Sequence, residues 1–217
     1  MSGESGVLGC RVVSTVGPVL IVGSGLLGAS LGLALRAGGV RVYLEDASPT
    51  SLRLACDVGA GEAFTDVLAE AGVRRSGCGS DRPGYESPRL VVVATPPDVA
   101  DRIIVESLQR FPDAIVTDVA SVKDAVVADV LDGLRSEGCL DAASRYVGSH
   151  PMAGRERSGA GAADADLFYG RPWVIVAHET TWPRAVLAAR ALATDVGAVP
   201  LEMNAGTHDH AVALVSH

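Results

Sequence analysis

The chain has 217 residues, of which 48% are hydrophobic and 20% charged, a composition typical of a globular protein with a sizeable core. Its formal net charge of -8 and its aromatic content of only 4% argue against nucleic-acid binding, which depends on clustered Lys and Arg and on aromatic stacking platforms. The four cysteines show neither metal-knuckle spacing nor the density of a disulfide scaffold, which predicts a reduced, cytoplasmic protein.

One segment has the length of a membrane span, because no charged residue occurs from Val12 to Leu35. Glycines interrupt this segment repeatedly, and Pro18 stands where a strand would begin. A basic n-region and a small-residue cleavage pattern are both missing. We therefore expect a strand, a tight turn and a buried helix here, and no membrane association.

Strands and helices are predicted to alternate along the chain. Short apolar runs predict strands at 19–23, 40–44, 90–94 and 114–117, ending near 149, at 173–177 and near 199. Helical periodicity and start signals such as Ser48-Pro49 predict helices at 26–35, 49–58, 97–110, 122–134 and 182–193. This alternation predicts an α/β fold of the Rossmann type, with a doubly wound and mostly parallel sheet.

The pattern changes from Asn204 onward to a helical run, NAGTHDHAVALVSH, that reaches His217 without a glycine stop. We interpret residues 18–203 as a dinucleotide-binding Rossmann domain. Residues 204–217 are then the first helix of a helical domain that is truncated in this chain. Apolar Val212 and Val215 facing solvent would support this division.

Gly23-Ser-Gly25-Leu-Leu-Gly28 is a G-x-G-x-x-G motif between an apolar strand and a helix, the context of a dinucleotide-binding loop. The first glycine permits a tight turn, the second lets a pyrophosphate approach the backbone, and the third lets the helix lie close to the strand. With Leu27, these glycines are the predicted phosphate-binding residues. A tight turn without a ligand is the alternative interpretation of the motif alone.

Asp46 ends the second predicted strand 23 residues after Gly23, near the offset of the acid that binds the ribose hydroxyls of NAD. Its charge would repel the 2′-phosphate of NADP, and Glu45 adds negative charge beside it. The predicted cofactor is therefore NAD. Thr95 and Pro96 follow another strand, at the edge of the sheet where the nicotinamide and substrate are expected.

Ser121 and His150 also follow predicted strands, so the same reasoning places them at the ligand-binding edge. His150 is the only histidine directly after a predicted strand, although a lone histidine is more often structural than catalytic. Lys123 stands at the start of the next helix, where a solvated or helix-capping side chain is expected.

Two segments, TDVASVK at 117–123 and GSHPMAGRERSG at 148–159, resemble the prephenate/arogenate dehydrogenase family, as do DLFYGRPWV at 166–174 and HDHAVALVSH at 208–217. The resemblance covers nearly the whole chain from residue 18. It implies NAD-dependent oxidative decarboxylation of prephenate to 4-hydroxyphenylpyruvate, or of arogenate to tyrosine, in tyrosine biosynthesis. The residues present leave both substrates open.

The resemblance also implies individual roles. His150 would be the base or hydrogen-bond acceptor for the ring hydroxyl, and Ser121 would orient His150 and touch the substrate. Glu156 would join an ionic network at the substrate entrance, and His208 and Ser216 would line the pocket. No metal is implied. Family members continue into a helical region that forms a homodimer and supplies an arginine for the substrate, which predicts little turnover for this chain alone.

Two alternatives stay open at this point. One is a Rossmann dehydrogenase acting on β-hydroxy acids or imines, in which Lys123 would be the catalytic lysine, although the HPMAG segment is then unexplained. The other is a truncated NAD-binding module without turnover, which the missing helical region motivates.

Overall fold

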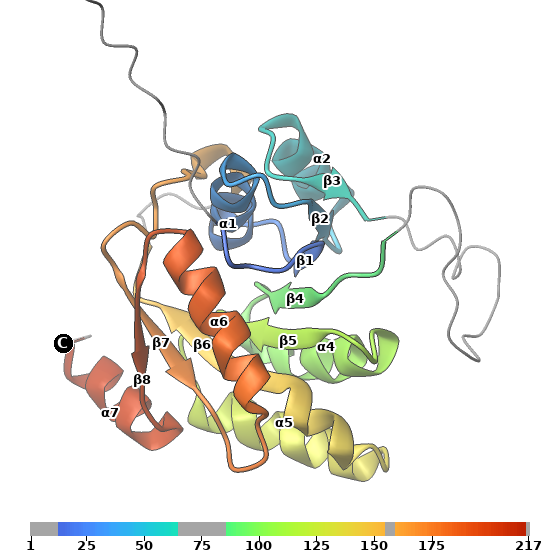
Figure 1. Ribbon diagram of the computed structural model, residues 1–217, viewed down its shortest axis with the longest axis vertical. Coiled ribbons are helices and arrows are strands. Elements are labelled where there is room, and N and C mark those ends of the chain that lie inside the picture. Colours follow the sequence, from blue (N-terminus) through green and yellow to red (C-terminus); the bar gives the residue numbers. More distant parts are fainter. Residues whose placement is uncertain (1–12, 65–85, 155–158, 216–217) are drawn as a thin grey trace, which may run out of the picture.

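The computed structural model describes residues 13–64, 86–154 and 159–215 of the chain. Figure 1 shows a single sheet with helices on both faces. Its eight strands lie in the order β3-β2-β1-β4-β5-β6-β7-β8, and every neighbouring pair is parallel except β6 with β7. The predicted α/β fold with a doubly wound, mostly parallel sheet is therefore confirmed.

The elements follow one another in the predicted alternation. The strands are β1 (Val19–Val22), β2 (Val42–Glu45), β3 (Glu62–Ala63), β4 (Leu90–Val93), β5 (Ile115–Asp118), β6 (Tyr146–Pro151), β7 (Pro172–Val176) and β8 (Val199–Glu202). The α-helices are α1 (Leu26–Ala37), α2 (Pro49–Asp57), α4 (Pro97–Arg110), α5 (Asp124–Ser136), α6 (Pro183–Asp195) and α7 (Ala205–Val215). Two 3-10 turns, η1 (Leu140–Arg145) and η2 (Ala160–Ala162), complete the described elements.

The core lies in two layers because successive side chains of a strand point to opposite faces of the sheet. On one face, Val19 and Ile21 of β1 pack with α1 and α6. On the other face, Leu20 packs with α4 and α5. Figure 1 shows α6 crossing the near face, with α4 and α5 behind the sheet. Burial on both faces explains why β1 and β4 are continuous apolar runs.

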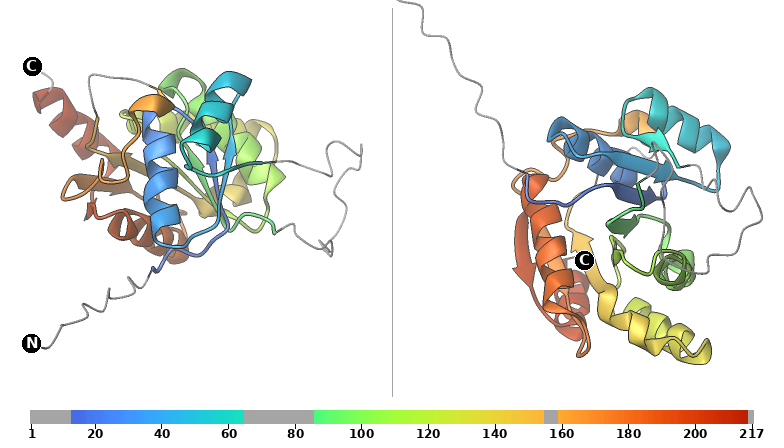
Figure 2. Two further views of the ribbon diagram at one scale, coloured as in Figure 1. Left: turned by 90° about the horizontal axis from the view of Figure 1, so that it is seen from above. Right: turned by 45° about the vertical axis from the view of Figure 1, so that its right-hand side comes forward.

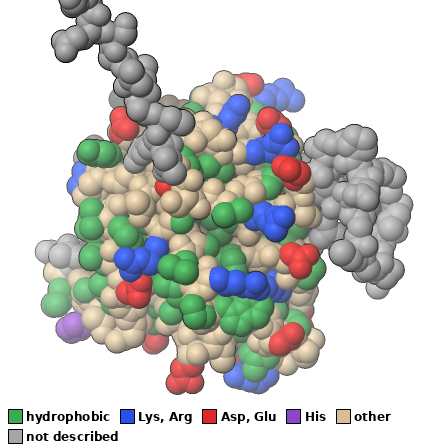
Figure 3. Space-filling view, in the orientation of Figure 1, with side chains coloured by type: hydrophobic (Ala, Val, Ile, Leu, Met, Phe, Trp, Pro, Cys, Tyr) green, Lys and Arg blue, Asp and Glu red, His purple; other side chains and the backbone are tan. Residues whose placement is uncertain are grey.

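The uncharged segment folds as β1, a glycine turn and α1, as predicted. Within the described ranges no helix combines the length and apolar character that crossing a membrane needs. On the face in Figure 3, acidic and basic side chains of the described residues are interspersed rather than gathered by sign.

Three local predictions differ from the structure. Strand β3 was not predicted, because it consists of two exposed residues at the sheet edge. Helix α5 begins at Asp124, two residues later than predicted, because its cap comes from a residue 85 positions away. Strand β6 continues to Pro151, since it pairs antiparallel with β7, so His150 lies within the strand rather than after it.

Helix α7 contacts the start of α5 and, through His208, strand β6, and its remainder extends away from the body of the fold, as the left view of Figure 2 shows. Val212 is half-buried, whereas Leu214 is 69% exposed; the side chain of Val215 and all of residues 216–217 lie outside the described part. The predicted exposure of Val212 is thus only partly met. The domain boundary between residues 203 and 204 stays a prediction.

Candidate active site

The glycine loop joins β1 to α1 in a conformation that requires glycine at two positions. Gly23 has φ of +101°, and a Cβ there would lie 2.5 Å from the carbonyl oxygen of Ala94. A Cβ on Gly28 would lie 1.9 Å from the carbonyl oxygen of Gly23, so α1 could not pack so closely against the turn. The first and third glycines therefore have the structural roles that the motif predicts.

The second glycine faces open space. A Cβ on Gly25 would meet no atom within 4 Å, and Gly25 is the N-cap of α1 without a side-chain cap. The first turn, which contains Leu27, has no acidic residue to occupy the N–H groups. These uncapped N–H groups and the positive end of the helix dipole suit a pyrophosphate.

Asp46 is held against this loop. Its Oδ2 accepts hydrogen bonds from the backbone N and the hydroxyl of Ser24, both at 2.7 Å, and its Oδ1 accepts one from the backbone N of Ser48 at 2.7 Å. Burial alone would raise the pKa of Asp46, but the hydrogen bonds from Ser24 and Ser48 outweigh it and lower the pKa. An ionised carboxylate therefore stands beside the turn.

Glu45, which was predicted to add negative charge beside Asp46, forms an ion pair with Arg110. Both carboxylate oxygens of Glu45 accept hydrogen bonds from Nη1 of Arg110 at 2.9 Å, so an adjacent cation offsets the charge of Glu45. Any discrimination against a 2′-phosphate is therefore left mainly to Asp46.

Thr95 and Pro96 connect β4 to α4 at the same edge of the sheet. Pro96 is exposed and is the N-cap of α4. The hydroxyl oxygen of Thr95 is buried and has no hydrogen-bond partner in the described part of the chain. Because buried polar atoms are nearly always paired, an unpaired hydroxyl beside the glycine loop fits a position that meets a ligand. The loop, Asp46 and Thr95 together fit a dinucleotide.

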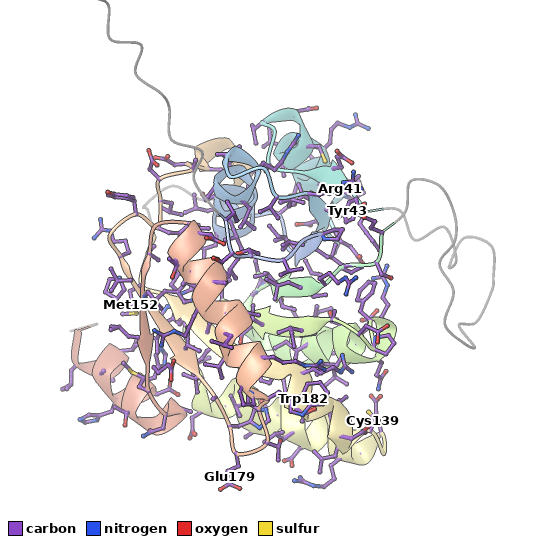
Figure 4. The ribbon with its side chains drawn as sticks, viewed as in Figure 1. Arg41, Tyr43, Cys139, Met152, Glu179 and Trp182 are labelled. Atoms are coloured by element: carbon purple, nitrogen blue, oxygen red, sulfur yellow. The ribbon has the colours of Figure 1, made fainter. Side chains whose placement is uncertain are left out.

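A hydrogen-bonded chain of three side chains lies at the carboxyl end of β6. Nδ1 of His150 and Nε2 of His208 are 2.9 Å apart, with the two rings in an edge-on arrangement. Nδ1 of His208 lies 2.6 Å from Oδ1 of Asp209. His150 is half-buried, and His208 is 1% exposed. Figure 4 labels Met152, two residues after His150, on the side of the molecule where α7 lies.

The surroundings of His150 favour a neutral imidazole. Its pKa is lowered from 6.5 to about 4, first by burial and then by the charges of His208 and Lys123, while Asp118 and Asp209 act in the opposite direction. At neutral pH the ring therefore holds one proton. A neutral imidazole can accept a hydrogen bond or a proton from a ligand.

A buried ionic network lies beneath this histidine. Nζ of Lys123 donates to Oδ2 of Asp118 and, at 2.8 Å, to the carbonyl oxygen of Ser149. The hydroxyl of Tyr146 donates to Oδ1 of Asp118 at 2.9 Å, and burial together with that carboxylate raises the pKa of Tyr146. All four of these residues are fully buried. The network fixes β6 at the residue that precedes His150.

The structure thus corrects the prediction for Lys123. Its backbone occupies the N-cap position of α5, but its side chain is 0% exposed and ion-paired rather than solvated. A lysine buried against a carboxylate has no access to a ligand, which removes the observation that favoured a β-hydroxy-acid or imine dehydrogenase with Lys123 as its catalytic lysine.

The remaining predicted residues are placed as follows. Ser121 is exposed in the loop between β5 and α5, and in the described part of the chain the ring of His150 is hydrogen-bonded to His208 rather than to Ser121. His208 contacts His150 directly. Glu156 and Ser216 lie outside the described residues. The sequence does not single out Asp209, although it is adjacent to His208 in the HDH triplet, because no spacing rule marks it.

Comparison with known proteins identifies the family. The model of the prephenate dehydrogenase nucleotide-binding domain matches residues 31–202, most of the chain. The chain belongs to the prephenate dehydrogenase family. The recognition based on the sequence segments is therefore confirmed.

Individual relatives agree with this assignment. The chain is 40% identical over 195 residues to the probable prephenate dehydrogenase NovF of Streptomyces niveus, covering 90% of this chain and 47% of that protein. It is also similar to the crystal structure of prephenate dehydrogenase from A. aeolicus in complex with hydroxyphenyl propionate and NAD+ (TM-score 0.73, 28% identity, 91% of this chain and 63% of that chain). A third match is Synechocystis arogenate dehydrogenase (TM-score 0.73, 26% identity, 92% and 64%).

This prephenate dehydrogenase family chain spans about half the length of the Streptomyces relative, at 47%, and less than two thirds of either crystallised chain, at 63% and 64%.

Proposed function

We propose that this chain is the nucleotide-binding part of an NAD-dependent dehydrogenase that oxidatively decarboxylates prephenate or arogenate in tyrosine biosynthesis in the cytoplasm. The observation that carries the proposal is a neutral imidazole, His150, at the carboxyl end of β6. Because β1, β4, β5 and β6 are parallel, this end of β6 lies at the same edge of the sheet as the glycine loop.

The cofactor site is supported by the features around the loop. The N-terminus of α1 at Gly25 would bind the pyrophosphate, Asp46 the adenosine ribose, and the Thr95 hydroxyl a nearby polar group of the cofactor. When bound, NAD supplies the acceptor for a hydride from ring C4 of the substrate. The crystallised A. aeolicus relative was determined with NAD+.

His150 acts on the ring hydroxyl of the substrate. Nε2 would accept the hydrogen bond of the C4 hydroxyl, whose oxygen donates electron density as the C4–H bond breaks. The bond between C1 and its carboxylate breaks at the same time, CO₂ leaves, and its electron pair completes the aromatic ring. The hydroxyl hydrogen remains in the phenolic product, so any proton that His150 takes is returned.

The other site residues are assigned by family position. Ser121 is exposed near the same edge, which allows contact with the substrate, and we assign Glu156 to the substrate entrance and Ser216 to the pocket. Residues 204–217 would be the first helix of a helical domain through which the longer protein forms a homodimer.

Turnover and cofactor binding test the proposal separately. Calorimetry measures NAD binding to this chain, and NADH absorbance measures turnover with prephenate and with arogenate, on this chain and on a form extended past His217. We expect NAD binding in both forms. Turnover confined to the extended form would make this chain by itself an NAD-binding module, for which its share of the relatives' length is the motivating observation.

Replacing His150 tests the base. In the form that turns over, His150→Asn should lower kcat about 10²- to 10⁴-fold and leave the Kd for NAD nearly unchanged, as expected for loss of a positioned general base. His178→Asn is the matched control, since His178 is also half-buried but binds the carbonyl oxygen of Ala143 away from the site. Equal turnover of the wild type and His150→Asn would refute the role of His150.

A further inference from the structure

The proton arrangement on His150 follows from the donors and acceptors that surround Asp209. The carboxylate of Asp209 accepts hydrogen bonds from the backbone N of Lys123 at 2.9 Å, through Oδ1, and from the backbone N of Asp124 at 2.9 Å, through Oδ2. Burial would raise the pKa of Asp209, but the hydrogen bonds from Asp124, His208 and Lys123 lower it. Asp209 is therefore an anion, fixed in orientation by the first turn of α5.

An ionised carboxylate can only accept hydrogen bonds. The nitrogen of His208 that faces it, Nδ1, must carry the proton across the 2.6 Å contact. In a neutral His208, Nε2 is then an acceptor. Across the 2.9 Å contact with His150, the proton must lie on Nδ1 of His150.

We propose that Asp209, acting through His208, is the positioning residue that keeps the single proton of His150 on Nδ1 and leaves Nε2 unprotonated. This inference rests on the proposed function only for its catalytic meaning, because Nε2 is then the nitrogen that meets the substrate hydroxyl. In the described part of the chain Nε2 of His150 has no hydrogen-bond partner, as a ligand-facing base requires. We call the hydrogen-bonded series Asp209–His208–His150 the relay. It crosses from α7 to β6 and joins elements that are far apart in the sequence.

The relay also explains why two histidines are brought into contact. His208 is almost fully buried, so its ring exchanges hydrogen bonds with protein groups rather than with solvent. The titratable groups around His150 are His208 and Asp209 of α7, Lys123 at the start of α5 and Asp118 of β5. Among these groups, in the described part of the chain, only His208 is hydrogen-bonded to the imidazole, so it sets which nitrogen of His150 holds the proton.

The sharpest perturbation is Asp209→Asn, which keeps the shape and one acceptor oxygen. The oxygen of Asn can still accept from the backbone N of Asp124, while its NH₂, in the place of Oδ1, can donate to Nδ1 of His208 and no longer accepts from the backbone N of Lys123. That reverses both imidazoles: His208 then donates from Nε2, and His150 carries its proton on Nε2. The equivalent change behind a serine-protease histidine leaves the geometry intact and lowers kcat about 10⁴-fold through the wrong tautomer.

The tautomer can be measured directly on this chain by NMR with ¹⁵N-labelled histidine, because protonated and unprotonated ring nitrogens have widely separated shifts. The signals of His150 are assigned by their loss in His150→Gln. We expect protonated Nδ1 and unprotonated Nε2 in the wild type at neutral pH, and the reverse in Asp209→Asn. In the form that turns over, Asp209→Asn should lower kcat about 10²- to 10⁴-fold with an unchanged Kd for NAD.

Asn204→Ala separates the relay from mere loosening of α7. Asn204 caps the same helix by accepting from the backbone N of Thr207 at 2.8 Å and is exposed. This variant should leave the tautomer of His150 unchanged. A proton on Nε2 in the wild type, or an unchanged tautomer in Asp209→Asn, would overturn the proposal. If the expected tautomers are observed but the extended form turns over neither prephenate nor arogenate, the proposed function is refuted and the positioning role of Asp209 is retained.

Discussion

Lys123→Met tests the buried ion pair beneath the active site. Lys123 and Asp118 have 0% exposed side chains, so the variant leaves a carboxylate buried without its counter-ion. Removing one partner of a buried pair typically costs about 3–5 kcal/mol. Asp118 keeps three donors, from Tyr146, Ala120 and Ser149, which places the expected loss near the lower end, at about 3 kcal/mol.

The matched control is an ion pair of the same kind in solvent. Arg190 and Glu202 form a salt bridge with side chains that are 46% and 51% exposed. Arg190→Met should therefore cost no more than about 1 kcal/mol. In urea titrations, an m-value of about 2–3 kcal/mol/M converts 3 kcal/mol into a midpoint shift of about 1–1.5 M for Lys123→Met, several times the shift of the control.

The double variant Lys123→Met/Asp118→Asn removes the uncompensated charge and should recover more than about 1 kcal/mol of the loss. It also serves if Lys123→Met does not fold. Equal midpoints for Lys123→Met and Arg190→Met, or a double variant less stable than Lys123→Met, would contradict the assignment of a buried charge pair that stabilises the fold.

Three further predictions concern the site. Gly25→Val should abolish NAD binding in calorimetry with little change in Tm, since its side chain fills open space. Gly28→Ala should lower Tm, because its Cβ collides with the turn. Equal Tm values for the two variants would contradict these different roles of the two glycines. Asp46→Asn should reduce the preference for NAD over NADP at least about tenfold in titrations, because it removes charge repulsion, and a wild type that prefers NADP would contradict this. His150 should titrate near pH 4 by NMR, below its usual pKa of 6.5. Its contribution to the free energy of unfolding is therefore fully present above pH 6.5 and is lost as the pH falls toward 4. Urea titrations of the wild type and His150→Gln at several pH values measure this loss.

The elements that sequence predicts well are those specified by local pattern. Continuous apolar residues determine β1 and β4, which are covered on both faces, and Pro97 to Arg110 has the predicted helix bounds. The glycine loop was also predictable, because Gly23 and Gly28 are required by contacts with the adjacent β4 loop and with the turn itself. Such features need only the periodicity and backbone freedom of a short segment.

The contacts around His150 were not predictable in this way. His150 and His208 are 58 positions apart, and Asp209 caps a helix that begins 85 positions earlier. The burial of Lys123 likewise depends on Asp118 and on the carbonyl oxygen of Ser149 in a different strand. Residue identity reveals these groups as candidates, but only tertiary packing decides which of them are paired, buried or neutral.

The helix that sequence pattern assigns to a second domain is hydrogen-bonded to the first. Asp209 replaces the missing cap of α5, and its neighbour His208 contacts the imidazole on β6. One carboxylate therefore both attaches α7 to the Rossmann fold and orders the protons of the site. A boundary at 203/204 separates two patterns of sequence, yet a cut there would divide a single hydrogen-bonded unit, because His150 would lose its partner and α5 its cap in the same step.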